Sequence, residues 1–477
     1  MLPESLPSET IRPERRGVLE AFYGRPWSWS ERHAMLDFMQ QTGFNAYLYA
    51  PKNDPIHRNR WQEPYTSTEW AAFGQLSAHA RAGGTEFIFG LSAVGFRYSD
   101  PAHLALMQSK LRAAKAQGIR SFALLLDDLP SRFESSEDAA AFPDLARAQG
   151  WLTNELLKDV EAGGELYFCP TEYHGSGNSA YLWALGSVLD LRVPVLWTGR
   201  EVCSPTISAA DLRNVTAALR RAPVIWDNFP VNDLDMQMDL HIAPLTGRTP
   251  ELLAATAGYF AAAGALAAAS QVAMRTTAAY LHDPHVYDPA GAFRASAQAS
   301  TSTPQEAAAL TFLADLARRT PLIGTEELHH ALWPAIDAFW AARGSPPAVA
   351  GPDLSGRPPP QPITPDEAPL RSLAQDIERH AETLARFSDP ALRANLAPWT
   401  AKLAGWGRVL KSALGALDHP HDLRAREYVL EELPVVRENF HWVAGDTFDL
   451  FARRCVWAAE AEARATARAA TPPEPAG

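Results

Sequence analysis

Short apolar runs alternate with amphipathic stretches from residue 17 to about residue 285. Each run is almost continuously apolar, which is typical of a strand buried on both faces of a parallel sheet. The stretches between them, such as "SERHAMLDFMQQTG" with Ser at its start and Gly at its end, have helical periodicity. The predicted strands cover 17–24, 46–51, 86–92, 121–128, 166–173, 194–199, 223–228 and a weaker apolar run at 264–270.

This alternation predicts an α/β fold. Eight strand–helix repeats favour a (β/α)8 TIM barrel over residues 17–285, preceded by an N-terminal extension at 1–16. A doubly wound open sheet is the alternative. The count of eight strands and the lack of a G-x-G-x-x-G turn argue against it.

The chain changes character after about residue 286, where Ala, Leu and charged residues dominate. We expect an all-α C-terminal helical domain at 286–468, followed by a disordered tail at 469–477. A Pro-rich stretch at 344–369 predicts a loop within this domain. The predicted helices lie near 305–319, 326–343, 367–387, 390–417 and 422–468.

Composition narrows the function classes. Hydrophobic residues make up 47% of the chain, which excludes global disorder, and the net charge of −12 without a basic stripe argues against a nucleic-acid partner. The Ala-rich run at 253–282 is interrupted by Gly and polar residues, so we expect no membrane span. Cys169, Cys203 and Cys455 have neither metal-ligand spacing nor an even count for a disulfide framework. With no apolar leader at the N-terminus, these features predict a cytoplasmic protein with reduced thiols and no metal or cofactor.

The stretch "FALLLDDLP" ends a buried strand in two adjacent carboxylates, Asp127 and Asp128. Burying one unpaired carboxylate is costly, and a second beside it raises that cost. The pair therefore either lies in solvent or serves chemistry. In a barrel, the ends of the other strands face the same rim. They supply Lys52, Tyr173, His174, Trp197, Trp226, Asn228 and Asp233.

Carboxylates, amides, a lysine and aromatic rings on one rim are what a carbohydrate site requires. Each has a plainer interpretation: adjacent acids are more often a solvated loop, a lone lysine a surface residue, and a lone tryptophan part of the core. Asp54 and His57 could suggest metal ligands, but no second pair supports them. The hypothesis therefore depends on the coincidence of positions.

Seven motifs in order make a resemblance specific. The segment from residue 17 to about 250 resembles glycoside hydrolase family 84, which includes O-GlcNAcases and bacterial β-N-acetylglucosaminidases. The motifs are "GVLEAFYGRPWSW", "AYLYAPKND", "HRNRWQEPY", "SFALLLDD", "FCPTEYHG", "VLWTG" and "APVIWDNFPVND".

The resemblance implies a retaining β-N-acetylglucosaminidase whose nucleophile is the 2-acetamido oxygen of the substrate, which forms an oxazoline; this is an exception to the carboxylate nucleophile of most retaining enzymes. The resemblance also implies that Asp127 orients the acetamido N–H and that Asp128 acts first as the general acid and then as the general base. Different environments would hold the pKa values of the two acids apart. The remaining matches are substrate-binding positions: Ala21, Lys52, Tyr173, Trp226, Asn228 and Asp233.

Two departures stand out. The family has Gly where this chain has Ala21, and a main-chain carbonyl contact survives that change if the backbone conformation does. A sugar-binding Asn of the family aligns with Ala262, which puts selectivity at C4 and C6 in question.

Three other hypotheses stay open: a sugar-binding pseudoenzyme, a metal-dependent barrel hydrolase using Asp127, Asp128 and His174, and a helical half that binds a partner with the barrel as scaffold. The expected partner is a GlcNAc-containing glycoconjugate or glycoprotein. Its aglycone could be a protein, a cell-wall fragment or a glycosaminoglycan. A homodimer through the helical domain is expected by analogy with family members.

Overall fold

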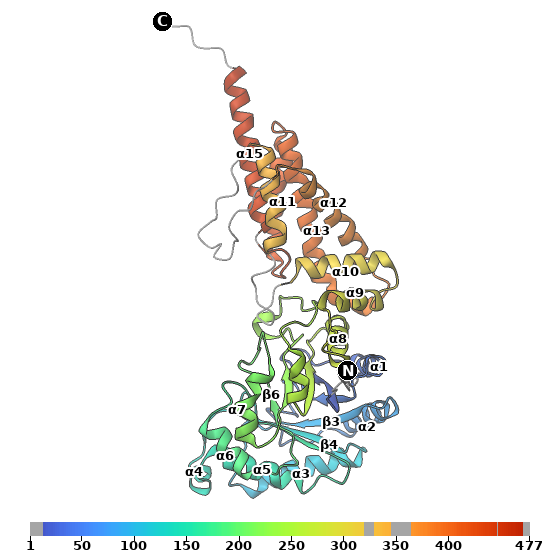
Figure 1. Cartoon of the computed structure of the whole chain (residues 1–477). Helices are drawn as coiled ribbons and strands as arrows, with labels where there is room; N and C mark the ends of the chain where they lie inside the picture. Colours follow the sequence, from blue (N-terminus) through green and yellow to red (C-terminus); the bar gives the residue numbers. More distant parts are fainter. Residues whose placement is uncertain (1–12, 319–328, 345–363, 446, 471–477) are drawn as a thin grey trace, which may run out of the picture. The chain divides into compact units, whose positions relative to one another are not determined.

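The computed structural model describes residues 13–318, 329–344, 364–445 and 447–470, which pack into two compact units (Figure 1). The first contains the described residues as far as Gln237 together with Pro244–Ser296. The second contains Met238–Ala243 and the described residues from Ala297 onward. Most of the predicted N-terminal extension, Pro-rich loop and tail lies outside the described residues.

Eight parallel strands form the centre of the first unit. Their order is β5-β4-β3-β2-β1-β8-β7-β6, and a bridge between Phe168 and Val195 joins β5 to β6 and closes the barrel. The predicted (β/α)8 fold is therefore confirmed, and the open doubly wound sheet is wrong. The strands are β1 (Arg15–Glu20), β2 (Ala46–Tyr49), β3 (Glu86–Leu91), β4 (Ser121–Leu125), β5 (Leu166–Cys169), β6 (Leu196–Trp197), β7 (Val224–Asp227) and β8 (Gly258–Ala262).

Helices follow the strands and cover the barrel. The first helix, Trp29–Thr42, shows how the sequence sets the boundaries. Ser28 caps its start and forms a capping box with Glu31 in the first turn, and Gly43 ends the helix with φ of 82°. The cap is thus Ser28 rather than the Ser at the start of the predicted stretch. The helices are α1 (Trp29–Thr42), α2 (Ser67–Ala82), α3 (Pro101–Ala116), α4 (Ser136–Ala141), α5 (Leu145–Leu157), α6 (Ala180–Val188), α7 (Ala209–Leu219) and α8 (Ala267–His282), with 3-10 turns at Leu234–Met236 and Pro250–Ala255.

The predicted eighth strand at 264–270 is wrong. The strand is Gly258–Ala262, and the alanines from Ala267 onward begin α8. Alanine is a strong helix former and a poor strand former, whereas Tyr259 and Phe260 favour a strand. The continuous apolar run across both elements hid the boundary between them.

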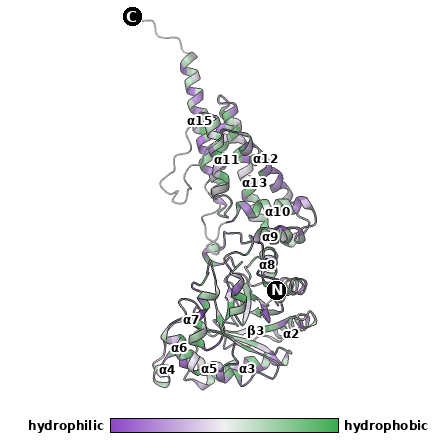
Figure 2. Ribbon diagram, viewed as in Figure 1, coloured by the Kyte–Doolittle hydropathy of each residue, from purple (hydrophilic) through white to green (hydrophobic). Residues whose placement is uncertain are grey.

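The second unit is helical. Buried residues of α12 recur at Leu370, Ala374, Ile377, Ala381 and Leu384, the spacing of a single core-facing stripe. Figure 2 shows the helices of this unit carrying both hydrophobic and hydrophilic residues, as such stripes require. The helices are α9 (Pro289–Ala299, which begins in the first unit), α10 (Pro304–Leu316), α11 (His329–Ala342), α12 (Ala368–Leu384), α13 (Pro390–Asp418), α14 (Leu423–Glu438) and α15 (Thr447–Ala470).

The stretch 422–468, predicted as one helical pattern, is two helices. The chain leaves α14 at Asn439, whose side-chain amide donates a 2.8 Å hydrogen bond to the main-chain oxygen of Pro398. Ala444 and Gly445 then have positive φ values, which a helix cannot contain. Among the described residues, no helix is long and apolar enough to cross a membrane.

Candidate active site

The chain turns sharply where β4 ends. Successive side chains of a strand point to opposite faces, so Asp127 and Asp128 would diverge if the strand simply continued. Asp128 instead has φ of 56°, a left-handed conformation that aspartate adopts more readily than most residues. Both carboxylates therefore line one cavity of about 410 Å³.

Asp127 is almost completely buried and shares Lys52 with its neighbour. One carboxylate oxygen of Asp127, Oδ2, accepts a hydrogen bond from the Lys52 ammonium, which also lies 3.7 Å from Oδ2 of Asp128. The other oxygen of Asp127, Oδ1, has no hydrogen-bond partner among the described residues. A buried carboxylate oxygen usually has a donor, so this atom is available to a donor on a ligand.

Two tyrosines hold Asp128. Tyr23 donates a 2.8 Å hydrogen bond to Oδ2 of Asp128, and Tyr173 donates a 2.7 Å bond to Oδ1. Burial disfavours the charged form of Asp128, but the Lys52 ammonium and both hydroxyls outweigh it, so the pKa of Asp128 lies below its usual value. Without a ligand the carboxyl is therefore held ionised and fixed in orientation.

The rest of the cavity comes from the ends of β1 and β7. Trp226 donates a 2.7 Å hydrogen bond from its indole nitrogen to Asn228, which in turn donates a 2.7 Å bond to the main-chain oxygen of Val202. Asp233 accepts a 2.7 Å bond from the main-chain N–H of Tyr23. Burial raises the pKa of Asp233. The cavity therefore combines an oriented amide, an aromatic wall and carboxylates.

The structure brings all eight sequence-predicted site positions to this one cavity. Tyr23 also lines the cavity; the sequence places it at the end of the first strand, but we assigned it no role, because its contacts depend on a fold that brings it against Asp128 and Asp233. The lining residues are Ala21, Tyr23, Lys52, Asp127, Asp128, Tyr173, Val202, Cys203, Trp226, Asn228, Val231, Asp233, Leu234, Asp235 and Met236.

Other rim candidates do not line the cavity. Trp197 is fully buried in the core, and His174 is exposed beside Tyr173. Asp54 accepts hydrogen bonds from the hydroxyls of Tyr49 and Tyr65 at 2.7 and 2.6 Å. These contacts give Asp54 a structural role.

His57, considered with Asp54 as a metal ligand, is buried next to the main chain of Gly90, and burial lowers its pKa to about 4. Among the described residues, no group of three or more His, Cys, Asp or Glu side chains could hold a metal ion.

Ala262 is buried at the end of β8, where it pairs with Leu19. It is not among the residues that line the cavity. The carboxamide of Asn232 lies against the following turn, so close to Gly264 that a Cβ there would come within 2.1 Å of its oxygen. Position 262, which the resemblance aligned with a sugar-binding Asn, is therefore a buried alanine outside the lining of the cavity.

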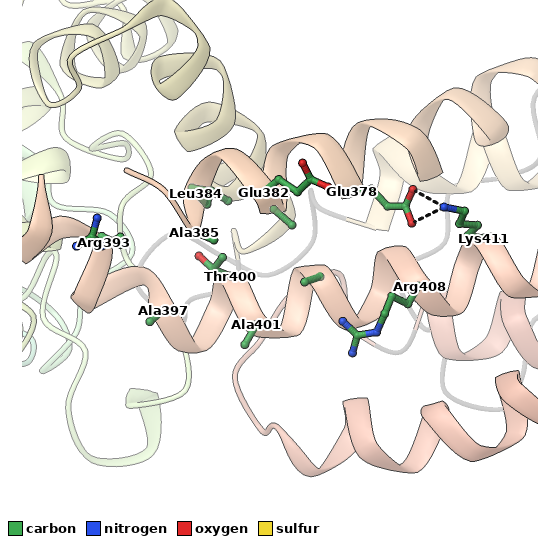
Figure 3. Close-up of a pocket in the computed structure, with 12 residues that line it drawn as sticks. Glu378, Glu382, Leu384, Ala385, Arg393, Ala397, Thr400, Ala401, Arg408 and Lys411 are labelled. Carbon is green, nitrogen blue, oxygen red and sulfur yellow. Dashed lines mark hydrogen bonds and ion pairs between the residues drawn. The ribbon is translucent and has the colours of Figure 1, made fainter. Parts of the chain in front are cut away.

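A second cavity, of about 590 Å³, lies within the helical unit between α12 and α13 (Figure 3). Alanines form much of its wall, and Glu378 and Lys411 pair with each other across it at 3.3 Å. It contains no adjacent carboxylates. The barrel cavity is therefore the candidate active site.

The structure is thus a (β/α)8 barrel with a cavity built around paired aspartates, and the comparisons with known proteins agree with this description. The model of the β-N-acetylglucosaminidase family matches residues 16–315. The chain belongs to this family, glycoside hydrolase family 84.

The similar proteins have related names. The Protein O-GlcNAcases of Rattus norvegicus and Mus musculus are each 36% identical to this chain over 271 residues, which is 55% of this chain and 29% of those proteins. The chain thus matches less than a third of their length. A solved mutant of the O-GlcNAc hydrolase of Thermobaculum terrenum is 28% identical, with a TM-score of 0.81, covering 96% of this chain and 98% of that one.

Proposed function

We propose that the protein is a retaining β-N-acetylglucosaminidase that removes terminal β-linked GlcNAc, with GlcNAc-modified protein as its substrate, by substrate-assisted catalysis. The observation that carries the proposal is Oδ1 of buried Asp127, which has no hydrogen-bond partner in the described part of the chain and lies one residue from Asp128 in a cavity of sugar-accepting size. The names of the similar proteins support the substrate class.

In the first step the acetamido oxygen of the sugar attacks C1, and the bond from C1 to the glycosidic oxygen breaks. Asp127 accepts the acetamido N–H on its free oxygen and stabilises the positive charge that develops on the oxazoline. Asp128 gives its proton to the departing oxygen. To act as the acid, Asp128 has to be protonated when the substrate is bound, although the contacts of the ligand-free site lower its pKa.

In the second step Asp128 removes a proton from water. The water oxygen forms a new bond to C1 from the face that the leaving group vacated, and the oxazoline ring opens. Two inversions at C1 give net retention. Lys52, Trp226, Asn228 and Asp233 would hold the sugar, with Tyr173 near the acetamido group.

Substitution of Asp128 tests the acid. We expect Asp128→Ala to lower kcat/KM by roughly 10²–10⁴-fold on a β-GlcNAc glycoside with a poor leaving group, the usual contribution of general acid catalysis. Activated aryl glycosides should lose less, because their leaving groups need little protonation. Equal losses on both substrates would contradict the assignment.

Substitution of Asp127 tests the nucleophile. Asp127→Asn should slow even activated substrates, because the oxazoline forms whatever the leaving group is. A matched glucoside without the acetamido group should be inert, and a thiazoline mimic should inhibit competitively. A sugar trapped covalently on a side chain would refute the mechanism.

The same assays separate the other hypotheses. No turnover of any β-GlcNAc glycoside would favour the sugar-binding pseudoenzyme, and activity abolished by a chelator and restored by a divalent metal would favour the metal-dependent hydrolase. The cytoplasmic location and the homodimer stay predictions.

A further inference from the structure

A third cavity, of about 450 Å³, adjoins the active site. Tyr23, Lys52 and Asp128 line both cavities, so these side chains form the wall between them. The new cavity is otherwise lined by Asn53, Pro55, Arg58, Asn59, Val94, Leu129 and Pro130.

Arg58 is the unusual residue of this cavity. The residue is only 7% exposed, yet its side chain forms no ion pair within 4 Å among the described residues. Nη2 makes one long hydrogen bond, 3.5 Å, to the main-chain oxygen of Asp128, and Nη1 has no partner there. A guanidinium is always charged, and buried charges are nearly always paired. Its nearest described counter-charge is the Asp128 carboxylate, whose pKa it helps to lower, and its Cζ lies 5.7 Å from the centroid of the Tyr23 ring. Because neither contact is a direct ion pair, the guanidinium can take an anionic ligand as its direct partner.

The position of the cavity says which part of the substrate reaches it. Trp226, Asn228 and Asp233 line only the first cavity, which is where the sugar is proposed to bind. The general acid must reach the oxygen between sugar and aglycone. The aglycone therefore leaves on the side of Asp128 away from the sugar, which is where Arg58 lies.

We propose, on the basis of the function above, that this cavity is an aglycone subsite in which Arg58 binds a carboxylate of an acidic peptide next to the GlcNAc-bearing residue. A guanidinium forms charge-assisted, bidentate hydrogen bonds with a carboxylate. The exposed amides of Asn53 and Asn59 on the same wall suit the main chain of an extended peptide. Val94, Leu129 and Pro130 offer apolar contact beside them.

Two pairs of glycopeptides provide the test, and every peptide carries one O-GlcNAc serine. In the first pair the residue directly before this serine is Glu or Gln. In the second pair the residue directly after it is Glu or Gln. Glu and Gln have the same shape, and the leaving oxygen is the same. We expect the wild-type protein to favour the Glu peptide of at least one pair by about five- to tenfold in kcat/KM, mostly through KM, and Arg58→Gln to reduce that ratio to about one.

Arg60→Gln is the matched control. It removes the same charge two residues away, from an exposed side chain that pairs with Glu63. The Glu preference should persist in this variant. If Arg58→Gln does not fold, Asn59→Asp places a negative charge on the same wall from an exposed position and should reduce or reverse the preference.

The outcomes are distinct. Equal rates on Glu and Gln peptides with active wild-type protein would overturn the subsite while leaving the proposed function intact. A uronate-bearing β-GlcNAc disaccharide favoured over its uronamide in an Arg58-dependent way, with no peptide preference, would replace the peptide by a glycosaminoglycan. No turnover of any substrate would overturn both proposals.

Discussion

At the scale of single residues, the candidate site depends on one backbone conformation and on the shared contacts of Asp128. The left-handed turn at Asp128 directs two successive carboxylates to one cavity, and Tyr23 and Tyr173 then fix the second one. Strained conformations of this kind gather at functional sites because surrounding contacts hold them in place. The hydroxyl of Tyr23 therefore helps to set the pKa of Asp128.

Loss of that hydroxyl should shift the pH profile. Tyr23 stabilises the ionised form of Asp128, so Tyr23→Phe removes a contact that lowers the pKa of Asp128, and this pKa should rise. A general acid works when protonated, so the basic limb of kcat/KM on a poor leaving group should move to higher pH. Tyr287→Phe, which removes a hydroxyl bonded to Leu245 outside the cavity, should leave the limb in place. A limb that moves to lower pH would contradict the assignment.

Selectivity at C4 is a second residue-scale prediction. Ala262 stands at the position that the resemblance aligns with a sugar-binding Asn, so we expect the sugar to lack one neutral hydrogen bond, a loss of about 0.5–1.5 kcal/mol. The loss should weaken GlcNAc binding. It should also weaken rejection of the C4 epimer, because binding of β-GalNAc then leaves fewer groups of the site without a hydrogen bond, so we expect measurable β-GalNAc hydrolysis. The measurement is kcat/KM on matched GlcNAc and GalNAc glycosides. A wild-type preference for GlcNAc above about a thousandfold, roughly 4 kcal/mol, would mean that another residue supplies the contact.

The sequence was enough to predict which residues reach the cavity. It did not predict the contacts that hold these residues in place. Asp127, Asp128, Lys52 and Trp226 follow strands whose ends meet in any barrel, so position along the chain was enough. The contacts of Tyr23 and of the Arg58 guanidinium with Asp128 depend on loop conformations between distant strands. No pattern of neighbouring residues encodes such contacts.

At the scale of elements, buried ion pairs tie the ends of strands to a helix and to a loop next to the site. Glu20, at the end of β1, is fully buried and accepts two hydrogen bonds of 2.9 Å from Arg32 of α1. Asp227, at the end of β7, is held in the same way by Arg248, whose Nε lies 2.8 Å from its carboxylate. Each pair fixes the strand residue immediately before a cavity-lining segment.

Breaking the first pair should destabilise the barrel. Arg32→Gln leaves the buried carboxylate of Glu20 without its cation, and such losses typically cost about 3–5 kcal/mol in the free energy of unfolding. Arg25→Gln is the control, because Arg25 pairs with Glu31 at an exposed position, where a pair is worth less than about 1 kcal/mol. Urea unfolding followed by the barrel's activity measures both. A loss at Arg32 no larger than at Arg25 would show that the pair does not hold α1 to the strand.

Element boundaries were less predictable than element types. Strands with aromatic and β-branched residues were found, whereas the boundary between β8 and α8 falls inside a run of small apolar residues that fits either structure. The break between α14 and α15 likewise depends on Asn439 reaching Pro398 from another helix, a tertiary contact. Tertiary packing decides such cases over local propensity.

At the scale of the whole molecule, the chain divides into a barrel unit and a helical unit, each with its own buried core. The sequence predicted a change of character at residue 286, and the compact units change over after Ser296. We propose that the two units are separate domains. Units with separate cores can unfold independently, in which case unfolding is not a single two-state process.

Calorimetry of the full chain should therefore show two thermal transitions, each sensitive to substitutions in one unit. Trp406 is buried in α13 and donates a 3.1 Å hydrogen bond to the main-chain oxygen of Val443, so Trp406→Ala should lower the helical transition through a loss of about 3–5 kcal/mol. Arg32→Gln should lower only the barrel transition. Hydrolysis of an aryl β-GlcNAc glycoside, measured along the same temperature ramp, should disappear with the barrel transition in all three proteins, because every residue of the candidate site belongs to the barrel unit. A single transition that both substitutions displace equally would show that the chain unfolds as one cooperative body and that the proposed division into domains is wrong.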